Sequence, residues 1–265
     1  MGILFKLNFL PDWLFILVYS IPPLLLMWLI HLGLQKFAPQ WELNDRDENM
    51  AAGGIASAAA LTGIVLAFVL ALSNQTIDNY QSEIRIEASQ IRNLDKLLAA
   101  SHGKKIEECR KPLLNYSKSI VQDEWPKLQQ QIGSPITTAM LTKIDDCVLI
   151  NTPKAESQSA TSLEIIKLMT QITESREKRI ANSSSSLSPL FWFVMHLGLM
   201  LTIILSALSF YTPGIIRKIN CSIQVITLCM LMALTMVLDR PFSSESNGVT
   251  NQPILDTIAH LETEK

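Results

Sequence analysis

The chain has 265 residues, of which 48% are hydrophobic and 17% are charged, and its formal net charge is −2. Its mean hydropathy of +0.25 is too high for an ordinary water-soluble domain of this length. The near-neutral charge, with no basic helix interleaved with aromatic residues, excludes the electrostatic pattern of a nucleic-acid-binding protein. We therefore expect an all-α integral membrane protein that contacts the lipid bilayer and binds no nucleic acid.

The apolar excess lies in four runs, roughly 13–34, 51–72, 189–211 and 219–238. Each is long enough to span a bilayer, since about 20 apolar residues cover its hydrocarbon core. The first run is too long, and lacks the small-residue cleavage site, for a signal peptide. Four spans place both termini and the long insert between the second and third spans on one side of the membrane. The Lys and Arg count is not decisive, and we favour the cytoplasmic side of a bacterial inner membrane.

The position of the insert bears on the state of its cysteines, and the spans define the expected domains. Cys109 and Cys147 fall in the insert, where a periplasmic location would let them pair, but two lone cysteines are more often free thiols in a reducing compartment. The expected domains are 1–72 with spans one and two, 73–187 as a soluble helical bundle continuous with span two, 188–240 with spans three and four, and 241–265 as a polar C-terminal tail.

One predicted helix, from Ala51 to about Leu98, organises the sequence. Its first 22 residues, Ala51 to Leu72, carry no charge and would extend about 33 Å. Beyond them neither Pro nor Gly interrupts the helical pattern. Apolar residues then recur every seven positions at Ile77, Ile84, Ile91 and Leu98, with Tyr80 and Leu94 in the companion positions. This heptad pattern predicts that the membrane helix continues directly into a soluble bundle.

The second span also carries the residues that could line a pore. Small residues at four-residue spacing, such as Gly53 and Ser57, let helices approach closely. An apolar stripe in its second half is more often lipid-facing or core, but it can form a constriction that closes by dewetting. The candidate pore-lining or gate residues are Ile64, Phe68, Leu72, Ser57 and Thr62. Acidic residues flank the span on both sides, and the candidate pore-mouth charges are Asp78, Glu83, Asp45, Asp47 and Glu48.

The rest of the insert and the tail read as helices separated by turns. We expect a helix from about Lys104 that bends at Trp125-Pro126, because proline removes a backbone donor. Further helices are predicted over about 135–150 and 162–182, and a short one over 254–261 in the tail.

The sequence shows no catalytic constellation. It has no Gly-rich phosphate loop, HExxH, CxxC or nucleophile elbow, and its four His and four Cys are widely spread. We therefore expect neither an enzyme nor a cofactor nor a metal site. Acidic pairs such as Asp145-Asp146 sit on predicted helices and are more typical of a solvated face than of a calcium loop.

Several short motifs resemble the bacterial "bestrophin-like domain" family of uncharacterised four-span membrane proteins, which is distantly similar to bestrophins. They cover roughly 50–242 and comprise Gly63-Ile-Val-Leu-Ala-Phe68, Glu87-Ala88, Asp123-Glu124-Trp125-Pro126, Arg176-x-x-Arg179 and Asp239-Arg240-Pro241-Phe242. The resemblance implies the layout of bestrophins, which are pentameric anion channels whose second span lines the pore with a hydrophobic neck. The chain departs from the family at Thr62 or its neighbours, where an aromatic is usual, and at 73–75, where a Trp is usual. The bestrophin calcium cluster has no counterpart here, so calcium gating is not implied.

Two hypotheses remain open. The first is a homo-oligomeric ion channel, a pentamer by resemblance, in which the second span lines the pore. The acidic residues at both mouths weakly favour cation or poorly selective conduction of inorganic ions. The alternative is a non-conducting membrane scaffold or sensor whose helical insert binds a partner through the heptad seam and the polar tail. A transporter is less favoured, because four spans are few and no inverted repeat is visible.

Overall fold

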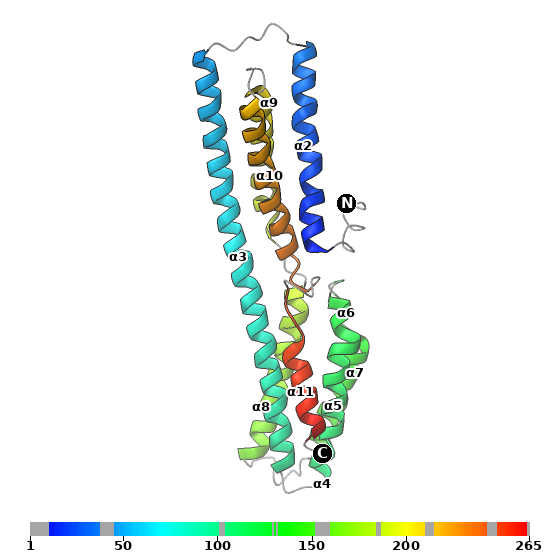
Figure 1. The fold of residues 1–265 in the computed structure, drawn as a ribbon. Helices are drawn as coiled ribbons and strands as arrows, with labels where there is room; N and C mark the ends of the chain where they lie inside the picture. The colour runs from blue at the N-terminus through cyan, green and yellow to red at the C-terminus, as the bar shows by residue number, and fades with distance from the viewer. Residues whose placement is uncertain are drawn as a thin grey trace. The chain divides into compact units, whose positions relative to one another are not determined.

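The computed structural model describes residues 11–37, 45–100, 104–128, 130, 132–151, 160–183, 187–209, 215–242 and 248–263. Over these residues the chain is helical and contains no strand, which confirms the all-α class (Figure 1). The helices are α2 (Asp12–Phe37), α3 (Asp45–Ala100), α4 (Lys104–Glu107), α5 (Arg110–Ser119), the π-helix η2 (Ile120–Glu124), α6 (Trp125–Leu128), α7 (Pro135–Asn151), α8 (Ala160–Ser183), α9 (Pro189–Ser209), α10 (Ile215–Leu238) and α11 (Gln252–Thr263).

Helices α2, α3, α9 and α10 are long and apolar enough to cross a membrane, which confirms the four expected spans. Helix α3 begins at Asp45 instead of near Ala51, so part of the expected connection is helical. It then continues without interruption to Ala100, as the heptad pattern predicted.

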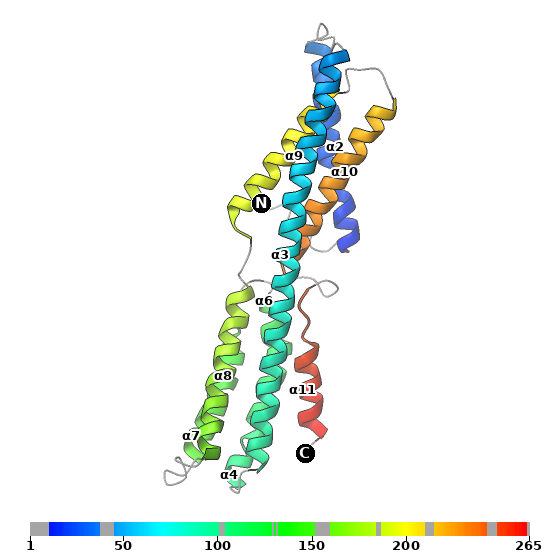
Figure 2. The same cartoon turned by 90° about the vertical axis from the view of Figure 1, so that its left-hand side faces the viewer.

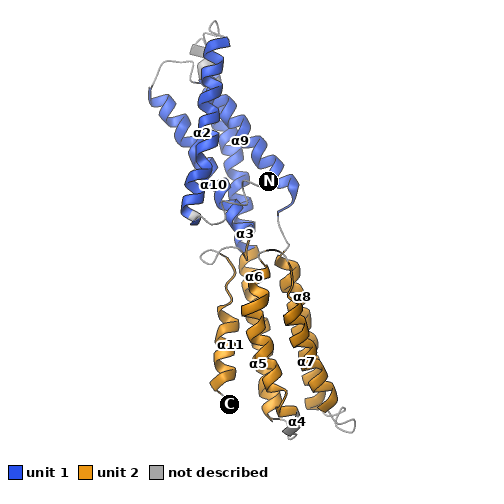
Figure 3. Cartoon of the chain, turned by 90° about the vertical axis from the view of Figure 1, so that its right-hand side faces the viewer, with its two compact units in different colours: residues 1–75, 186–239 blue, residues 76–185, 240–265 orange. Residues whose placement is uncertain are grey.

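The chain forms two compact units (Figure 3). We call residues 1–75 and 186–239 the membrane unit, and residues 76–185 and 240–265 the soluble unit. Helix α3 contributes its first part to one and its second part to the other. The sequence set 241–265 apart as a tail, whereas Ile254 and Leu261 of α11 are buried in the core of the soluble unit.

In the membrane unit, α2 packs against α9 and α10, and α9 packs against α10 (Figure 1). One face of α3 joins this core through Leu66 and Val69, which are at most 1% exposed. Gly198 of α9 marks a close approach, because a Cβ at this position would lie 2.5 Å from the Thr62 hydroxyl oxygen. Small residues at helix contacts of this kind supply the packing that lipid cannot.

In the soluble unit, the heptad residues of α3 form the centre of the core. Ile84, Ile91 and Leu98 are at most 2% exposed, whereas Ile77 and Tyr80 are partly buried against the same cluster. This confirms the predicted seam. Figure 2 shows α8 and α11 on different sides of the lower, cyan-green part of α3.

The expected bend at Trp125-Pro126 takes a specific form. Proline has no N–H, and its ring would clash with the carbonyl four residues earlier. The turn before it widens into η2, in which the Trp125 N–H donates to the Ile120 carbonyl. A π-turn inserts one extra residue and rotates the side chains that follow. Glu124, the last residue of η2, is fully buried.

The cysteines of the insert differ from the expectation of free thiols. Cys109 and Cys147 form a disulfide with their Cα atoms 5.8 Å apart. The reason is tertiary: α4 and α5, which flank Cys109, both pack against α7, which carries Cys147. A spacing of 38 residues gives no sign of this contact in the sequence.

Candidate functional site

The first part of the site is the face of α3 that the other helices of the membrane unit leave uncovered. Ile64 is 66% exposed and Phe68 is 58% exposed. Ser57 is also exposed and lies two turns before Ile64, on the same side of the helix. Leu72 is half-buried at the end of this stripe. We call Ser57, Ile64 and Phe68 the free face of α3.

Thr62 does not belong to the free face, contrary to expectation. It lies about 140° around the helix from Ser57, because each residue turns an α-helix by about 100°. Its side chain is buried, and its hydroxyl donates to the Ala58 carbonyl at 2.7 Å. The neighbour of Thr62 is Gly198 of the same chain. Thr62 therefore packs two helices together instead of lining the exposed stripe.

The candidate pore-mouth charges divide into three cases. Asp78 is exposed on α3. Glu83 is half-buried and accepts a hydrogen bond from the Asn182 amide of α8, so it is part of the packing of the soluble unit. The side chains of Asp45, Asp47 and Glu48 lie outside the described residues.

The second part of the site is a buried ionic network in the soluble unit. It joins Glu87 of α3, Glu124 of η2 and two arginines of α8, Arg176 and Arg179. The Arg179 guanidinium donates to both carboxylates, with one nitrogen 2.5 Å from Glu124 and another paired with Glu87. Arg176 donates to Glu124 at 2.6 Å. The side chains of Glu87, Glu124 and Arg179 are at most 1% exposed.

Neutral groups add further hydrogen bonds to this network, in which the buried Arg179 Nε alone has no hydrogen-bond partner among the described residues. The Tyr116 hydroxyl donates to Glu87 at 3.4 Å, and the Ser134 N–H donates to Glu124 at 3.2 Å. Arg176 also donates to the Thr138 hydroxyl at 2.8 Å. Two positive and two negative side chains thus balance formally. Buried charges are tolerated only when paired in this way, so the network holds α3, α5, η2, α7 and α8 in one arrangement.

The environment shifts the two carboxyl groups in opposite directions. Burial raises the pKa of Glu87 above its ordinary value, because Arg179 offsets only part of the desolvation. Burial also acts to raise the pKa of Glu124, but hydrogen bonds from Arg176 and the charge of Arg179 outweigh it and hold that pKa below its ordinary value. Glu124 is therefore the firmly ionised member of the network.

The other family-motif residues lie close to this network or at the edges of the units. Phe242 packs against Trp125 with ring centroids 5.6 Å apart, and its second aromatic neighbour is Tyr80 at 6.3 Å. The Pro241 carbonyl accepts a hydrogen bond from the Val249 N–H at 2.7 Å. These contacts fasten the segment after α10 onto the soluble core.

Three motif residues have other roles. In the membrane unit, the Asp239 carboxylate accepts a hydrogen bond from the Leu187 N–H at 2.6 Å, just before α9. Arg240 is exposed. Nothing lies within 4 Å of a Cβ placed on Gly63, so packing within the chain does not require glycine there.

Sequence reasoning marked the charged residues only as family signatures and missed the network. Its oppositely charged partners are separated by 52 to 92 residues along the chain. The one local signal is Arg176 and Arg179, which lie three residues apart on one face of an amphipathic helix that buries both.

A family model of the bestrophin-like domain matches residues 18–253. A bacterial bestrophin homologue from Klebsiella pneumoniae, solved as a point variant, has a similar fold with a TM-score of 0.63 at 13% identity, and the match covers 94% of this chain and 98% of that chain. A second variant of a bacterial bestrophin homologue from Klebsiella pneumoniae gives a TM-score of 0.61 at 15% identity over 94% and 96% of the two chains.

A crystal structure described only as a membrane protein gives a TM-score of 0.66 at 12% identity and covers 94% of this chain and 97% of that chain. No curated protein sequence matches the chain. At these identities the solved structures show the shared fold alone. The family model covers most of the sequence, and the four apolar helices suit a bilayer. The chain is therefore a membrane protein that belongs to the bestrophin-like family.

Proposed function

We propose that the chain forms a homo-oligomeric ion channel in which α3 of each subunit faces a central axis. The observation that carries the proposal is the free face of α3. Ile64 and Phe68 are 66% and 58% exposed even though the opposite face of the same helix is buried. Membership of the bestrophin-like family supports the proposal, and by analogy with bestrophins the oligomer is a pentamer.

In this proposal the side chains of Ile64 and Phe68 form a ring that narrows the path, and Leu72 contributes at its end. An apolar ring excludes water when it is narrow, and ions then face a dewetted barrier. Ser57 would lie in a wider part of the path, where a small hydroxyl side chain leaves room for water.

The charges next to this helix favour cation or poorly selective conduction. Asp78 is the exposed acidic residue after the span, since Glu83 is engaged with Asn182. Arg85, seven residues beyond Asp78, lies on the same side of α3 and is also exposed. A negative and a positive side chain on one face discriminate weakly between cations and anions.

Ion flux through liposomes that contain the purified protein tests the proposal. Phe68→Ala removes the bulk of the proposed constriction, so we expect several-fold faster flux than with the native protein. Phe193→Ala is the matched control, because Phe193 is a 64% exposed phenylalanine of α9 in the same unit. We expect no change in flux for this control.

Two outcomes would count against this account in different ways. If Phe68→Ala, Phe193→Ala and the native protein give equal flux, Phe68 does not narrow the path. A reversal potential equal to the chloride equilibrium potential in a KCl gradient would contradict cation or poorly selective conduction, but it would still show that the protein conducts ions.

The second candidate function is a non-conducting scaffold or sensor, and exposed apolar side chains of the soluble unit favour it. Ile136 of α7 is 47% exposed, and Leu163 and Ile166 of α8 are 57% and 39% exposed. Exposed apolar groups of this kind often mark contacts with another protein. The absence of flux in liposomes, together with loss of a bound partner from Leu163→Ser, would support the scaffold.

We also propose that the insert and both termini face the cytoplasm of the bacterial inner membrane. More Lys and Arg residues lie near the ends of the spans on the insert side than in the short connections, which favours this orientation without deciding it. The Cys109–Cys147 disulfide favours the opposite orientation, because disulfides persist mainly in oxidising compartments. Labelling from each side of the membrane decides between them.

A further inference from the structure

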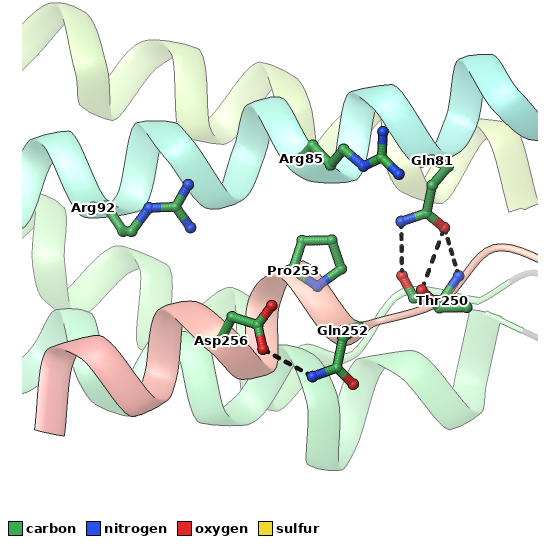
Figure 4. Close-up of a pocket in the computed structure, with 7 residues that line it drawn as sticks. All are labelled: Gln81, Arg85, Arg92, Thr250, Gln252, Pro253 and Asp256. Atoms are coloured by element: carbon green, nitrogen blue, oxygen red, sulfur yellow. Dashed lines mark hydrogen bonds between the residues drawn. The ribbon is translucent and has the colours of Figure 1, made fainter.

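A polar groove lies between α3 and the start of α11 in the soluble unit (Figure 4). Its volume is about 610 Å³, within the range of about 300–1,000 Å³ that is typical of sites for small molecules. Its polar lining comprises Gln81, Arg85 and Arg92 of α3, and Thr250, Gln252 and Asp256 of the C-terminal segment. None of these residues belongs to the free face of α3 or to the buried ionic network, and Arg85 is shared with the charges considered for ion selectivity.

Two arginine side chains dominate the charge of the groove. Arg85 and Arg92 lie seven residues apart on one side of α3, so about two helical turns or 10 Å separate their Cα atoms. Figure 4 shows both arginines on the side of α3 that borders the groove, with the Arg85 side chain extending along α3 toward Gln81. Arg92 donates to the Thr257 hydroxyl at 2.7 Å, whereas Arg85 is exposed and has no ion pair among the described residues.

The nearby carboxylates of α3 are engaged elsewhere. Asp95 lies one turn beyond Arg92, but it accepts two hydrogen bonds from Arg110 at 2.8 and 2.9 Å. Glu83 is bonded to Asn182, and Glu87 belongs to the buried network.

Across the groove, the carboxylate of Asp256 accepts a hydrogen bond from the Gln252 amide at 2.8 Å. Two cationic side chains therefore face one carboxylate, and the groove carries a net positive charge.

The groove is held open by specific bonds. The Gln81 side chain accepts from the Thr250 N–H at 2.8 Å and donates to the Thr250 carbonyl at 3.4 Å, which fixes the chain just before α11. Buried Ile254 and Leu261 anchor α11 itself in the core. A groove with fixed walls costs a ligand little ordering free energy on binding.

We propose that this groove binds a small organic dianion, with one carboxylate or phosphate group on Arg85 and another on Arg92. A guanidinium group binds such groups through two parallel hydrogen bonds. Asp256 would accept a hydrogen bond from a hydroxyl or ammonium group in the middle of the ligand. The groove lies in the soluble unit and not on the free face of α3, so this site differs from the proposed path of a permeant ion. The inference does not depend on conduction.

The test measures binding to the full-length protein in detergent by isothermal titration calorimetry. The probes are malate, succinate, 3-phosphoglycerate and inorganic phosphate, so that a ligand with two carboxylates is distinguished from one with a carboxylate and a phosphate. We expect malate or 3-phosphoglycerate to bind with a Kd at or below about 1 mM. Arg85→Gln should weaken that binding by about tenfold, because it removes a charge-assisted contact.

Lys178→Gln is the matched control, since it removes one exposed positive charge from α8 outside the groove. Arg92→Gln also removes the bond to Thr257, so its melting temperature without ligand is recorded alongside. Arg85→Gln breaks no bond that the structure describes and therefore keeps the test valid even if Arg92→Gln is unstable.

Asp256→Ala tests the class of ligand. If the Asp256 carboxylate accepts a hydrogen bond from a ligand hydroxyl, the native protein prefers malate to succinate, and the variant, which has no acceptor at this position, binds both alike. The proposal is overturned if neither organic anion binds in the millimolar range, if Arg85→Gln binds as the native protein does, or if inorganic phosphate binds as tightly as the organic anions.

Discussion

Arg179→Met is the sharpest test of the buried ionic network. The Arg179 guanidinium is shared by Glu87 and Glu124, and its side chain is 1% exposed. Methionine fills a similar length of space but carries no charge. After the change Glu124 keeps Arg176 at 2.6 Å, whereas Glu87 keeps only the Tyr116 hydroxyl at 3.4 Å.

The expected loss of folding stability follows from the Glu87 carboxylate, which is left without an ion-pair partner. Removing one partner of a buried ion pair costs about 3–5 kcal/mol. In a domain of this size each kcal/mol lowers the melting temperature by about 2–4 °C, so we expect a decrease on the order of 10 °C. Adding Glu87→Gln to Arg179→Met removes the unpaired charge and should restore about half of the loss.

Thermal unfolding of the full-length protein, followed by near-ultraviolet circular dichroism, measures these changes. Lys167→Met is the control, because Lys167 pairs with Glu164 at 3.3 Å on the surface, with side chains 60% and 47% exposed. An exposed pair contributes about 0–1 kcal/mol, so this variant should melt close to the native protein. Equal melting temperatures for Arg179→Met and Lys167→Met would refute our account of the network, as would additivity of Arg179→Met and Glu87→Gln.

Three further predictions concern other parts of the chain. Gly198→Ala places a methyl group 2.5 Å from the Thr62 hydroxyl oxygen, so it should lower the melting temperature of the detergent-solubilised protein, and Thr62→Ala should restore part of the loss; no loss with Gly198→Ala would contradict the close approach. If the insert lies in an oxidising compartment, the protein from freshly alkylated cells should run on a non-reducing gel as one species with the Cys109–Cys147 disulfide. If the insert is cytoplasmic and reduced, Cys109 and Cys147 should react with maleimide only after the membrane is made permeable. The pKa of Glu124 is lowered in the folded protein, so the ionised carboxylate stabilises the fold above pH 4.5, the ordinary glutamate pKa, and this stabilisation is lost as the pH falls below it. Glu124→Gln should therefore lower the melting temperature at pH 7 and make it depend less on pH in the acid range. An unchanged dependence of the melting temperature on pH would contradict the lowered pKa.

The parts of the fold that depend on local pattern could be predicted from the sequence. Span length and uninterrupted hydropathy indicated α2, α3, α9 and α10, because crossing a bilayer demands them. A repeat of seven residues indicated that Ile84, Ile91 and Leu98 form one seam, and they are buried together.

The parts that depend on contacts between distant segments could not be predicted. Glu87 and Arg179 are 92 residues apart, and the local sequence around either residue does not indicate that the two form an ion pair. Cys109 and Cys147 meet only because α4 and α5 pack against α7. Thr62 was grouped with the pore-lining candidates by composition, although its angular position on α3 turns it toward Gly198.

The central claim, that the free face of α3 lines a path through an oligomer, is tested most directly by cryo-electron microscopy of the detergent-purified protein. Our account predicts a closed ring of identical subunits in which Ile64 and Phe68 from every subunit point toward the axis. A monomer, or a dimer with Ile64 and Phe68 buried between two subunits and no axial path, would contradict it.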